Sequence, residues 1–174
     1  MIKYKTTGYH GTTYDAAQNI LREKQFLHST RKNDWLGTGS YFFAYKAHAR
    51  HWLKNENFKS QKTAILEADF EYTREQLLDL DDPQDFFRLE RTISKAIANI
   101  KTAKNPGPIV DFKNLPLDKQ WCFACNFYRK FNQSVGIIVY TFPKIESRSI
   151  TGFSQNQRQI CVSDDNLIVN VKES

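Results

Sequence analysis

The sequence is poor in cysteine, glycine and proline, with three, seven and five of these residues among 174. So few glycines and prolines exclude collagen-like repeats and flexible linkers. No apolar run approaches the roughly 18 residues that a membrane-spanning helix needs. The first six residues lack the apolar core of a secretory signal. We therefore expect a soluble, cytoplasmic protein.

The three cysteines do not suggest a metal site. Cys122 and Cys125 form a Cys-x-x-Cys pair, and Cys161 stands alone. A structural zinc site needs a second such pair or a histidine pair, and neither occurs nearby. We therefore predict no metal and interpret the pair as small apolar residues on a helix face, with a redox pair as the alternative.

The periodicity of apolar residues favours an α+β fold. Hydrophobic residues make up 40% and charged residues 25% of the chain, which is ordinary for a globular protein, and the length favours one domain over residues 1–174. The pattern predicts strands at 3–10, 26–29, 40–44, 62–72, 135–142, 159–162 and 166–171, and helices at 14–24, 45–53, 83–103 and 118–131. The third helix would place Phe86, Phe87, Ile93, Ile97 and Ile100 on one face. Helices fall between strands without strict alternation, which favours α+β over α/β.

Charge is distributed unevenly along the chain. Residues 1–60 hold ten Lys and Arg against four Asp and Glu, and this segment also contains all four histidines. Residues 67–90 carry nine acidic residues and two arginines. The N-terminal third is therefore expected to form an electropositive surface, suited to a phosphate-bearing ligand or to nucleic acid. A solvated basic face without a ligand is the alternative.

Three short segments carry the candidate chemistry, although each one alone is weak. They are Tyr9-His-Gly-Thr-Thr13, Trp35-Leu-Gly-Thr-Gly-Ser-Tyr-Phe-Phe-Ala44 and Gln157-Arg-Gln-Ile-Cys-Val162. The glycine pair of the second segment lacks the third glycine of a dinucleotide-binding fingerprint, and no phosphate-binding loop of the Gly-x-x-x-x-Gly-Lys-Ser/Thr type occurs. The order and spacing of all three segments is more informative than any single one.

In that order the segments resemble the ADP-ribosyltransferase superfamily of the diphtheria-toxin and poly(ADP-ribose)-polymerase type. That family is known by a His–Tyr–Glu triad: a strand ending in His-Gly-Ser/Thr, a Gly-x-Gly-x-Tyr-Phe-Ala segment and a late strand carrying the glutamate. Here His10, Tyr41 and Gln159 occupy the three positions, with one extra Phe before Ala44. The resemblance covers about residues 8–54 and returns near 155–168. It implies split antiparallel or mixed sheets around a central NAD+ cleft with flanking helices.

The resemblance also implies how NAD+ would be held. His10 would bond the adenosine ribose, the Gly11 backbone would grip the nicotinamide carboxamide and Thr12 would support the ribose. Tyr41 would stack on the nicotinamide ring, and Trp52, eleven residues later, or its neighbour His51 would close the other side. For the pyrophosphate, Arg31 and Lys32 are the preferred basic contacts and Arg22 is a less favoured one.

The third position departs from the family pattern. Gln159 can donate and accept hydrogen bonds, but it carries no charge and cannot act as a base. In the family, a third residue other than glutamate is linked to single transfers, which implies a mono-transferase. A substitute carboxylate could come from Glu67, Asp164 or Asp165, and we favour Asp34 because it lies in the loop before Tyr41. Gln157 resembles the acceptor-facing position of arginine-modifying relatives.

The sequence therefore predicts a mono-ADP-ribosyltransferase that uses NAD+ as co-substrate and no metal. We favour a nucleic-acid acceptor over a protein acceptor, because Trp35, Phe42 and Phe43 could stack on bases of a single strand. Two further functions are compatible with the same segments: an NAD+ glycohydrolase, and an inactive module that binds NAD+ or nucleic acid. A minimal catalytic domain of this kind resembles a toxin or host-defence effector, for which an antitoxin or immunity protein would be a partner.

Overall fold

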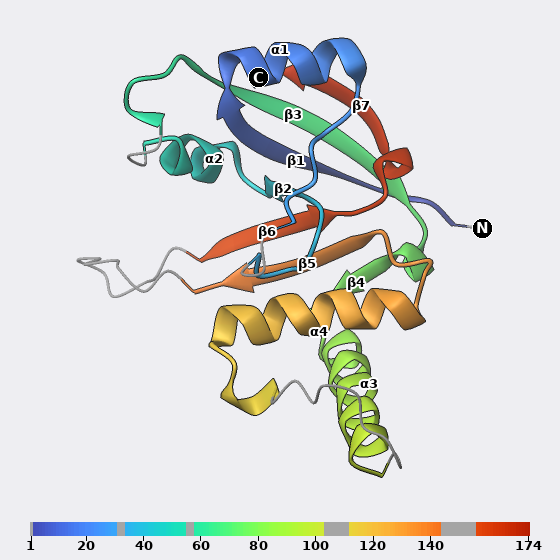
Figure 1. The fold of residues 1–174 in the computed structure, drawn as a ribbon. Helices are drawn as coiled ribbons and strands as arrows, with labels where there is room; N and C mark the ends of the chain where they lie inside the picture. Colours follow the sequence, from blue (N-terminus) through green and yellow to red (C-terminus); the bar gives the residue numbers. More distant parts are fainter. Residues whose placement is uncertain (1, 31–33, 55–57, 103–111, 144–155) are drawn as a thin grey trace, which may run out of the picture.

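The computed structural model describes residues 2–30, 34–54, 58–102, 112–143 and 156–174 (Figure 1). Within these ranges the chain forms a mixed sheet of seven strands with four α-helices, an α+β arrangement. The strands are β1 (Tyr4–Thr13), β2 (Ser40–Phe43), β3 (Thr63–Tyr72), β4 (Leu77–Asp79), β5 (Ile137–Phe142), β6 (Gln157–Val162) and β7 (Ile168–Glu173). The helices are α1 (Tyr14–Glu23), α2 (Lys46–Trp52), α3 (Pro83–Thr102) and α4 (Leu117–Phe131).

The seven strands form one continuous sheet, but the pairing between β1 and β2 near its centre is very short. Its strand order is β4-β5-β6-β2-β1-β3-β7, and all neighbours are antiparallel except β4 and β5. β1 pairs with β3 over its whole length, whereas it pairs with β2 only at Tyr9 and Phe43. Instead of the two separate sheets expected from the sequence, one sheet therefore consists of two halves joined at a single register pair.

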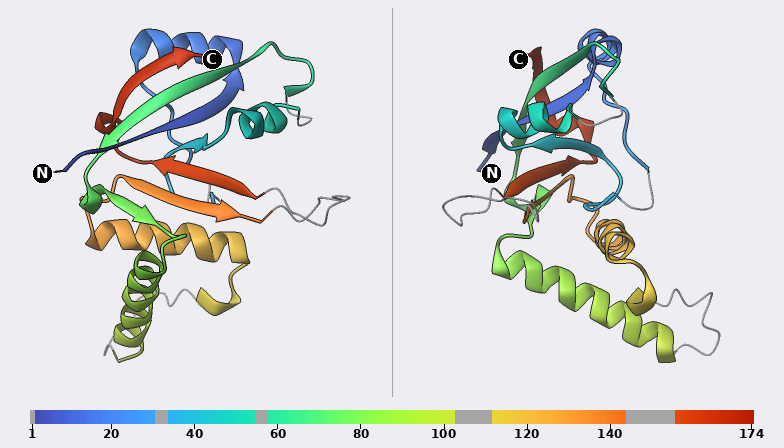
Figure 2. Two further views of the ribbon diagram at one scale, coloured as in Figure 1. Left: turned by 180° about the vertical axis from the view of Figure 1, so that it is seen from behind. Right: turned by 90° about the vertical axis from the view of Figure 1, so that its left-hand side faces the viewer.

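Two apolar cores cover the two faces of this sheet. One core surrounds Phe42 and Phe70 and receives Ala17 and Ile20 of α1. The other core contains Cys161 and Ile138 and is closed by α3 and α4. Figures 1 and 2 show α1 and the α3–α4 pair at opposite ends of the molecule. The first core receives side chains from both halves of the sheet, whereas the strand residues of the second core all come from the β4-β5-β6-β2 half; β2, β5 and β6 alternate their side chains between the two cores.

The helices begin and end close to where the sequence predicts. Thr13 caps α1 by accepting a hydrogen bond from the Ala16 amide at 3.3 Å, and Lys24 ends the helix in a left-handed conformation. On α3, however, the expected apolar face is only partly buried: Leu89 and Ile93 enter the core, but Phe86 and Phe87 are 43% and 67% exposed. The two phenylalanines therefore do not share the buried face of Ile93, with which the sequence pattern grouped them.

Three strand predictions also needed correction. β1 does not end at His10 but runs on to Thr13, because its last residues pair with β3. Residues 26–29 are not a strand and contribute only an isolated bridge between Ser29 and Gly39. The short strand β4 was not expected, and it joins the sheet as a parallel partner of β5.

The cysteine prediction was confirmed: Cys122 and Cys125 are free, buried residues of α4, and Cys161 is free and buried in β6. Burial raises the pKa of all three thiols, that of Cys125 to about 12. No helix in the described part of the chain is long and apolar enough to cross a membrane.

Candidate active site

The three sequence segments meet at the narrow centre of the sheet. β1, β2 and β6 are consecutive strands, and Tyr9, Phe43, Gln159 and Tyr140 form one cross-strand row. Residues separated by more than a hundred positions in the chain are therefore neighbours at one point. His10 directly follows the first member of this row. The spacing that suggested a common site is matched by a common location.

His10 holds the two halves of the sheet together through its side chain. Its Nδ1 lies 2.8 Å from the carbonyl oxygen of Tyr41, and its ring packs against Phe26 and Phe42. Burial lowers the pKa of His10, an effect that the bond to the Tyr41 carbonyl only partly offsets, so the imidazole is neutral near pH 7. A carbonyl only accepts, which fixes the proton on Nδ1 and leaves Nε2 as an acceptor.

The Tyr41 ring does not approach the His10 ring. Successive residues of a strand face opposite sides, so Tyr41 points away from Phe42, into the core that contains Cys161. Its hydroxyl accepts a bond from the Leu36 amide at 2.9 Å and donates one to the Gly37 carbonyl at 2.7 Å. The structure thus brings together the His10 ring and the Tyr41 backbone, and the phenol closes the turn that precedes β2.

Arg129 of α4 braces the same turn, and sequence reasoning did not single it out. Its guanidinium donates to the carbonyl oxygens of Thr38, at 2.7 Å, and Cys161, at 3.3 Å. One side chain therefore ties α4 to the glycine-rich turn and to β6. A lone arginine in the last turn of a helix gives no sequence signal that distinguishes this role from a solvated charge.

Gly11 lies where the last turn of α2 packs on β1. A Cβ added to Gly11 would come within 2.9 Å of Leu53 Cγ and 3.2 Å of the Ala49 carbonyl oxygen, so only glycine fits without rearrangement. Beyond Tyr9 the paired neighbour of β1 is β3, and the strand separates from β2 here. Thr12, the next predicted residue, is partly buried opposite Ala64.

A row of positive charge lies on α2 and just after it, beside this point. Lys46 and Arg50 are four residues apart, which places them along one side of the helix, and Lys54 follows in the turn after its end. Arg50 and Lys54 also line a shallow pocket at the end of β3. Sequence reasoning missed these residues, although their i, i+4 spacing was available as a signal. The predicted Trp52 is 41% exposed and packs on Phe58 at 4.7 Å between ring centroids, and His51 is exposed.

Of the other predicted basic contacts, Arg31 and Lys32 lie outside the described residues. Arg22 is an exposed residue of α1 that donates to Asn19 and to Glu23, at 2.8 and 3.0 Å.

The carboxylates considered as substitutes for glutamate all have partners. Asp34 accepts a bond from the Ser29 hydroxyl at 2.6 Å, and its charge helps to raise the pKa of Tyr41, after burial and Cys161. The other three are engaged elsewhere: Glu67 with Lys172 at 2.8 Å, Asp164 with the Asn166 amide at 3.1 Å, and Asp165 with His28 at 2.9 Å. Of the four, Asp34 is therefore the one placed next to the turn that Tyr41 closes.

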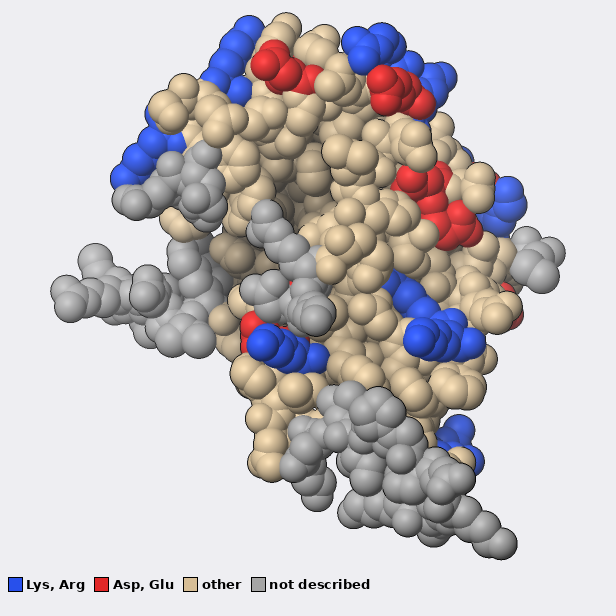
Figure 3. All heavy atoms as spheres, in the orientation of Figure 1, with Lys and Arg blue, Asp and Glu red and all other residues tan. Residues whose placement is uncertain are grey.

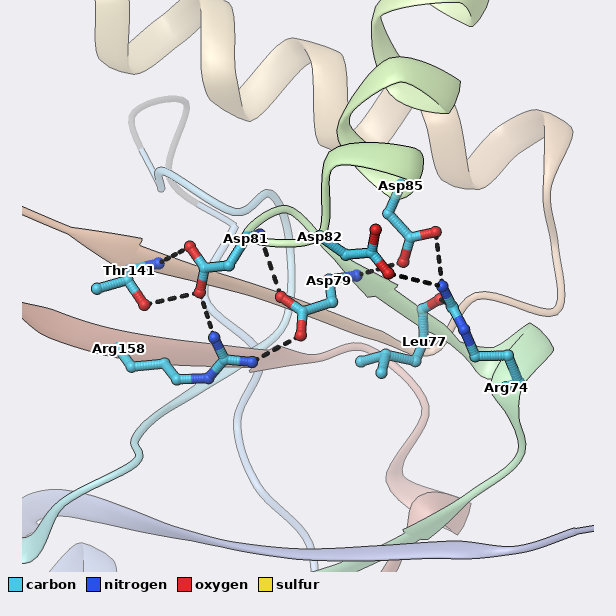
Figure 4. Close-up of polar contacts among 8 residues, drawn as sticks. All are labelled: Arg74, Leu77, Asp79, Asp81, Asp82, Asp85, Thr141 and Arg158. Atoms are coloured by element: carbon cyan, nitrogen blue, oxygen red, sulfur yellow. Dashed lines mark hydrogen bonds and ion pairs between the residues drawn. The ribbon is translucent and has the colours of Figure 1, made fainter.

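A polar network fixes β6 beside Gln159 (Figure 4). Arg158 donates to Asp79 at 2.7 Å and to Asp81, which in turn accepts two bonds from Thr141, at 2.7 and 3.0 Å. The carbonyl of Arg158 accepts from the amide of Ala44 at 3.0 Å. Because Gln157 and Gln159 flank Arg158, this network sets the position of both glutamines, which project to the opposite face.

A cavity of about 190 Å³ opens on the face to which these glutamines project, between α3, α4 and β5. Its lining is mainly apolar and includes Tyr140 and Phe142, the register partners of Gln159 and Gln157. The molecular face drawn in Figure 3 is hollowed below α1, where β1 and β2 lie in Figure 1.

The predicted aromatic and basic surfaces differ from expectation. Phe42 is 1% exposed and Phe43 is partly buried, so of the three aromatic residues proposed to stack on bases only Trp35, at 40%, is well exposed. On the face in Figure 3, Lys and Arg side chains lie apart near the margins with Asp and Glu between them. The positive charge of the N-terminal third is thus divided on this face.

Comparison with known proteins adds one relative. The chain is 35% identical over 85 residues to an uncharacterized protein of Methanocaldococcus jannaschii, a match that covers 46% of this chain. The chain spans 40% of the length of that relative. No family model matches, and no solved structure matches. No group of three or more His, Cys, Asp or Glu within the described ranges is placed to hold a metal ion.

Proposed function

We propose that the protein is a mono-ADP-ribosyltransferase with an ADP-ribosyltransferase fold, which transfers ADP-ribose from NAD+ to a nucleic acid. One observation carries the proposal: the three segments that resemble the family's triad segments lie on consecutive strands and share one cross-strand row. Unrelated turns have no reason to coincide in this way. We propose that the dinucleotide binds where β1 separates from β2 beyond Tyr9.

NAD+ would bind across this separation. The acceptor Nε2 of neutral His10 suits a ribose hydroxyl. Lys46 and Arg50 of α2, with Lys54 just after the helix, would neutralise the pyrophosphate. In this arrangement Tyr41 orients His10 through its carbonyl and rigidifies the turn through its phenol.

The reaction replaces one glycosidic bond by another. The bond between C1′ of the nicotinamide ribose and the pyridinium nitrogen breaks, and its electron pair leaves with neutral nicotinamide. An amine of the acceptor forms the new bond to C1′ and releases its proton to water. The transition state resembles an oxocarbenium ion. Gln159 would bond the ribose hydroxyl without supplying charge, which is consistent with one slow transfer rather than chain growth.

A nucleic-acid acceptor is favoured by the net charge of +6 and by the basic row of α2. Exocyclic amines of bases need little help from a general base once NAD+ is activated. We further propose that the protein acts as a toxin or host-defence effector in the cytoplasm, neutralised by an antitoxin or immunity protein.

The test is transfer of label from NAD+ labelled in its adenylate part to RNA, single-stranded DNA and lysate protein. We expect label on nucleic acid, lost on nuclease treatment and retained after protease. Gln159→Ala should reduce transfer by at least about tenfold, whereas Gln84→Ala, an exposed glutamine on α3, should leave it unchanged. Label on protein alone would favour a protein-modifying transferase, and free ADP-ribose without transfer would favour the glycohydrolase. Intact NAD+ with every acceptor would remove the enzymatic proposal.

A further inference from the structure

The cavity between α3, α4 and β5 has the lining of a site for a flat aromatic ligand. Trp35, Trp121 and Phe142 form a three-ring cluster, with ring centroids 4.5 to 5.9 Å apart, and Tyr140 continues it at 4.8 Å from Phe142. Trp35 is 40% exposed whereas Phe142, at 5%, belongs to the core, so the cluster opens to solvent on its Trp35 side. Rings arranged at angles around an open cavity present both faces and edges to a planar guest.

Polar side chains lie at the rim of this aromatic cavity, where they can form hydrogen bonds to the edge of a bound ligand. Glu90 of α3 and Gln120 of α4 line the opening, and the Gln120 amide nitrogen donates to the Leu115 carbonyl at 2.7 Å. A carboxylate accepts hydrogen bonds and donates none. The rim therefore favours a guest that presents N–H donors, such as the exocyclic amine of a nucleobase.

The position of the cavity relates it to the proposed reaction. Tyr140 is the register partner of Gln159 and Phe142 that of Gln157, and all four side chains lie on one face of the sheet. A base seated against Tyr140 is thus beside the glutamine at the third triad position. In the proposed transfer, ADP-ribose would be attached to the exocyclic amine of this base or to that of an adjacent nucleotide.

We infer that this cavity binds one amino-bearing base of a single-stranded nucleic acid and is the acceptor subsite of the enzyme. The inference rests on the proposed function for its role as acceptor site, but binding of the base does not require NAD+. Aromatic cavities with a carboxylate at the rim also suit methylated ammonium groups. We infer a base rather than such a cation because the cavity lies on the face of the sheet to which Gln159, at the third triad position, projects.

The first experiment measures binding without NAD+. Trp52→Phe removes the one tryptophan outside the cavity, so that the emission of Trp35 and Trp121 reports on the cavity alone. In this background we expect short oligo-dC to quench the emission, with tighter binding than oligo-dT, which lacks an exocyclic amine. Glu90→Gln should remove this preference. A dye-labelled oligonucleotide gives the Kd independently by anisotropy.

Two neighbouring phenylalanines of α3 provide the matched pair of variants. Phe86 lines the cavity mouth and is 43% exposed, whereas Phe87 does not line it and is 67% exposed, so both substitutions by alanine should leave the fold intact. Loss of one stacking surface corresponds to about five- to 150-fold in affinity. We therefore expect Phe86→Ala to weaken oligo-dC binding at least about fivefold and Phe87→Ala to leave it unchanged.

The outcomes separate the inference from the proposed function. Equal effects of the two variants, absence of quenching, or quenching by a trimethyl-lysine peptide in preference to oligo-dC would overturn the base subsite. Specific binding of oligo-dC together with no label transfer would retain the subsite and remove the transferase. Label transfer to DNA that Phe86→Ala and Glu90→Gln leave unchanged would retain the transferase and refute the acceptor subsite.

Discussion

Replacement of Tyr41 by Phe separates the two roles that sequence and structure give this residue. The substitution keeps the ring, and so keeps any stacking on nicotinamide, but it deletes the hydroxyl. In the structure that hydroxyl accepts from the Leu36 amide and donates to the Gly37 carbonyl. Burial, followed by the influence of Cys161, raises the pKa of Tyr41 well above its usual range. The hydroxyl therefore keeps its proton, and the hydrogen bond that it donates, at every pH at which the folded protein would be studied.

The expected loss of folding stability follows from the hydrogen-bonding groups that lose a partner when the Tyr41 hydroxyl is removed. Leu36 is 1% exposed, so the variant leaves its buried N–H without this partner, whereas the buried Gly37 C=O still accepts from Cys161 Sγ at 3.6 Å. An unsatisfied buried group costs about 1–3 kcal/mol. The substitution should therefore remove about 1–3 kcal/mol from a total that is commonly about 5–15 kcal/mol. For a chain of this length the corresponding drop in Tm is about 2–12 °C.

Urea denaturation followed by circular dichroism measures this loss, with Tyr45→Phe as the control. Tyr45 is 63% exposed, and its substitution should change the free energy of unfolding by less than about 0.5 kcal/mol. If Tyr41→Phe is as stable as the wild type, the hydroxyl does not close the turn and the reassignment of Tyr41 from stacking to positioning fails. A Tyr41→Phe variant that is as stable as the wild type but no longer binds NAD+ would also contradict the positioning role of Tyr41.

Three further predictions concern the sheet centre and its supports. Because burial lowers the pKa of His10, the unfolded chain takes up a proton first as pH falls below about 6.5, and the free energy of unfolding should fall by up to about 1.4 kcal/mol per pH unit until the folded-state pKa is reached. Urea titrations at several pH values should show this slope in the wild type and a smaller one in His10→Gln. Asp85 is fully buried, and although burial alone would raise its pKa, hydrogen bonds from Arg74 and from the Asp79 amide hold that pKa below its usual value. Asp85→Asn should therefore cost about 1–3 kcal/mol at neutral pH, and the wild type should lose the same contribution as acid titrates the carboxylate; equal acid sensitivity of the two proteins would contradict this. At Gly39, where φ is +155°, an alanine Cβ would lie 2.5 Å from the Val162 carbonyl oxygen, so thermal melting of Gly39→Ala should show a loss of more than about 2 kcal/mol.

Most helices and long strands could be predicted from the sequence because their signals are local. The cap at Thr13 and the proline at position 83 mark helix starts, and the alternation of residues 62–72 marks β3. Boundaries that depend on distant partners could not be predicted. β1 extends to Thr13 because β3 offers it a partner, and β4 exists because three residues find β5.

The proximity of the three segments could be predicted from the sequence, whereas the geometry of their side chains could not. Spacing suggested that the segments of His10, Tyr41 and Gln159 share a site, and β1, β2 and β6 are consecutive strands. Which face of the sheet each ring occupies depends on the register of β2, and a shift of one residue moves every side chain of the strand to the opposite face. The extra phenylalanine in the segment Tyr41–Ala44 leaves the sequence register ambiguous, and the structure places Phe42 in the core and the Tyr41 ring on the other face.

The structure also offers a reason for a glutamine at position 159. A carboxylate there would lie in a row with Tyr9, Phe43 and Tyr140, three aromatic rings that supply no charge compensation, and Arg158 beside it already engages its guanidinium with Asp79 and Asp81 on the opposite face. Burial beside such rings would raise the pKa of a glutamate and weaken the charge that makes it useful. In the proposed reaction, a neutral amide would keep the hydrogen bond to a ribose hydroxyl without that penalty. The proton of the acceptor would then pass to solvent, which would favour acceptors whose amines are neutral; the aromatic amines of bases are neutral near pH 7, whereas the guanidinium and ammonium groups of proteins are charged.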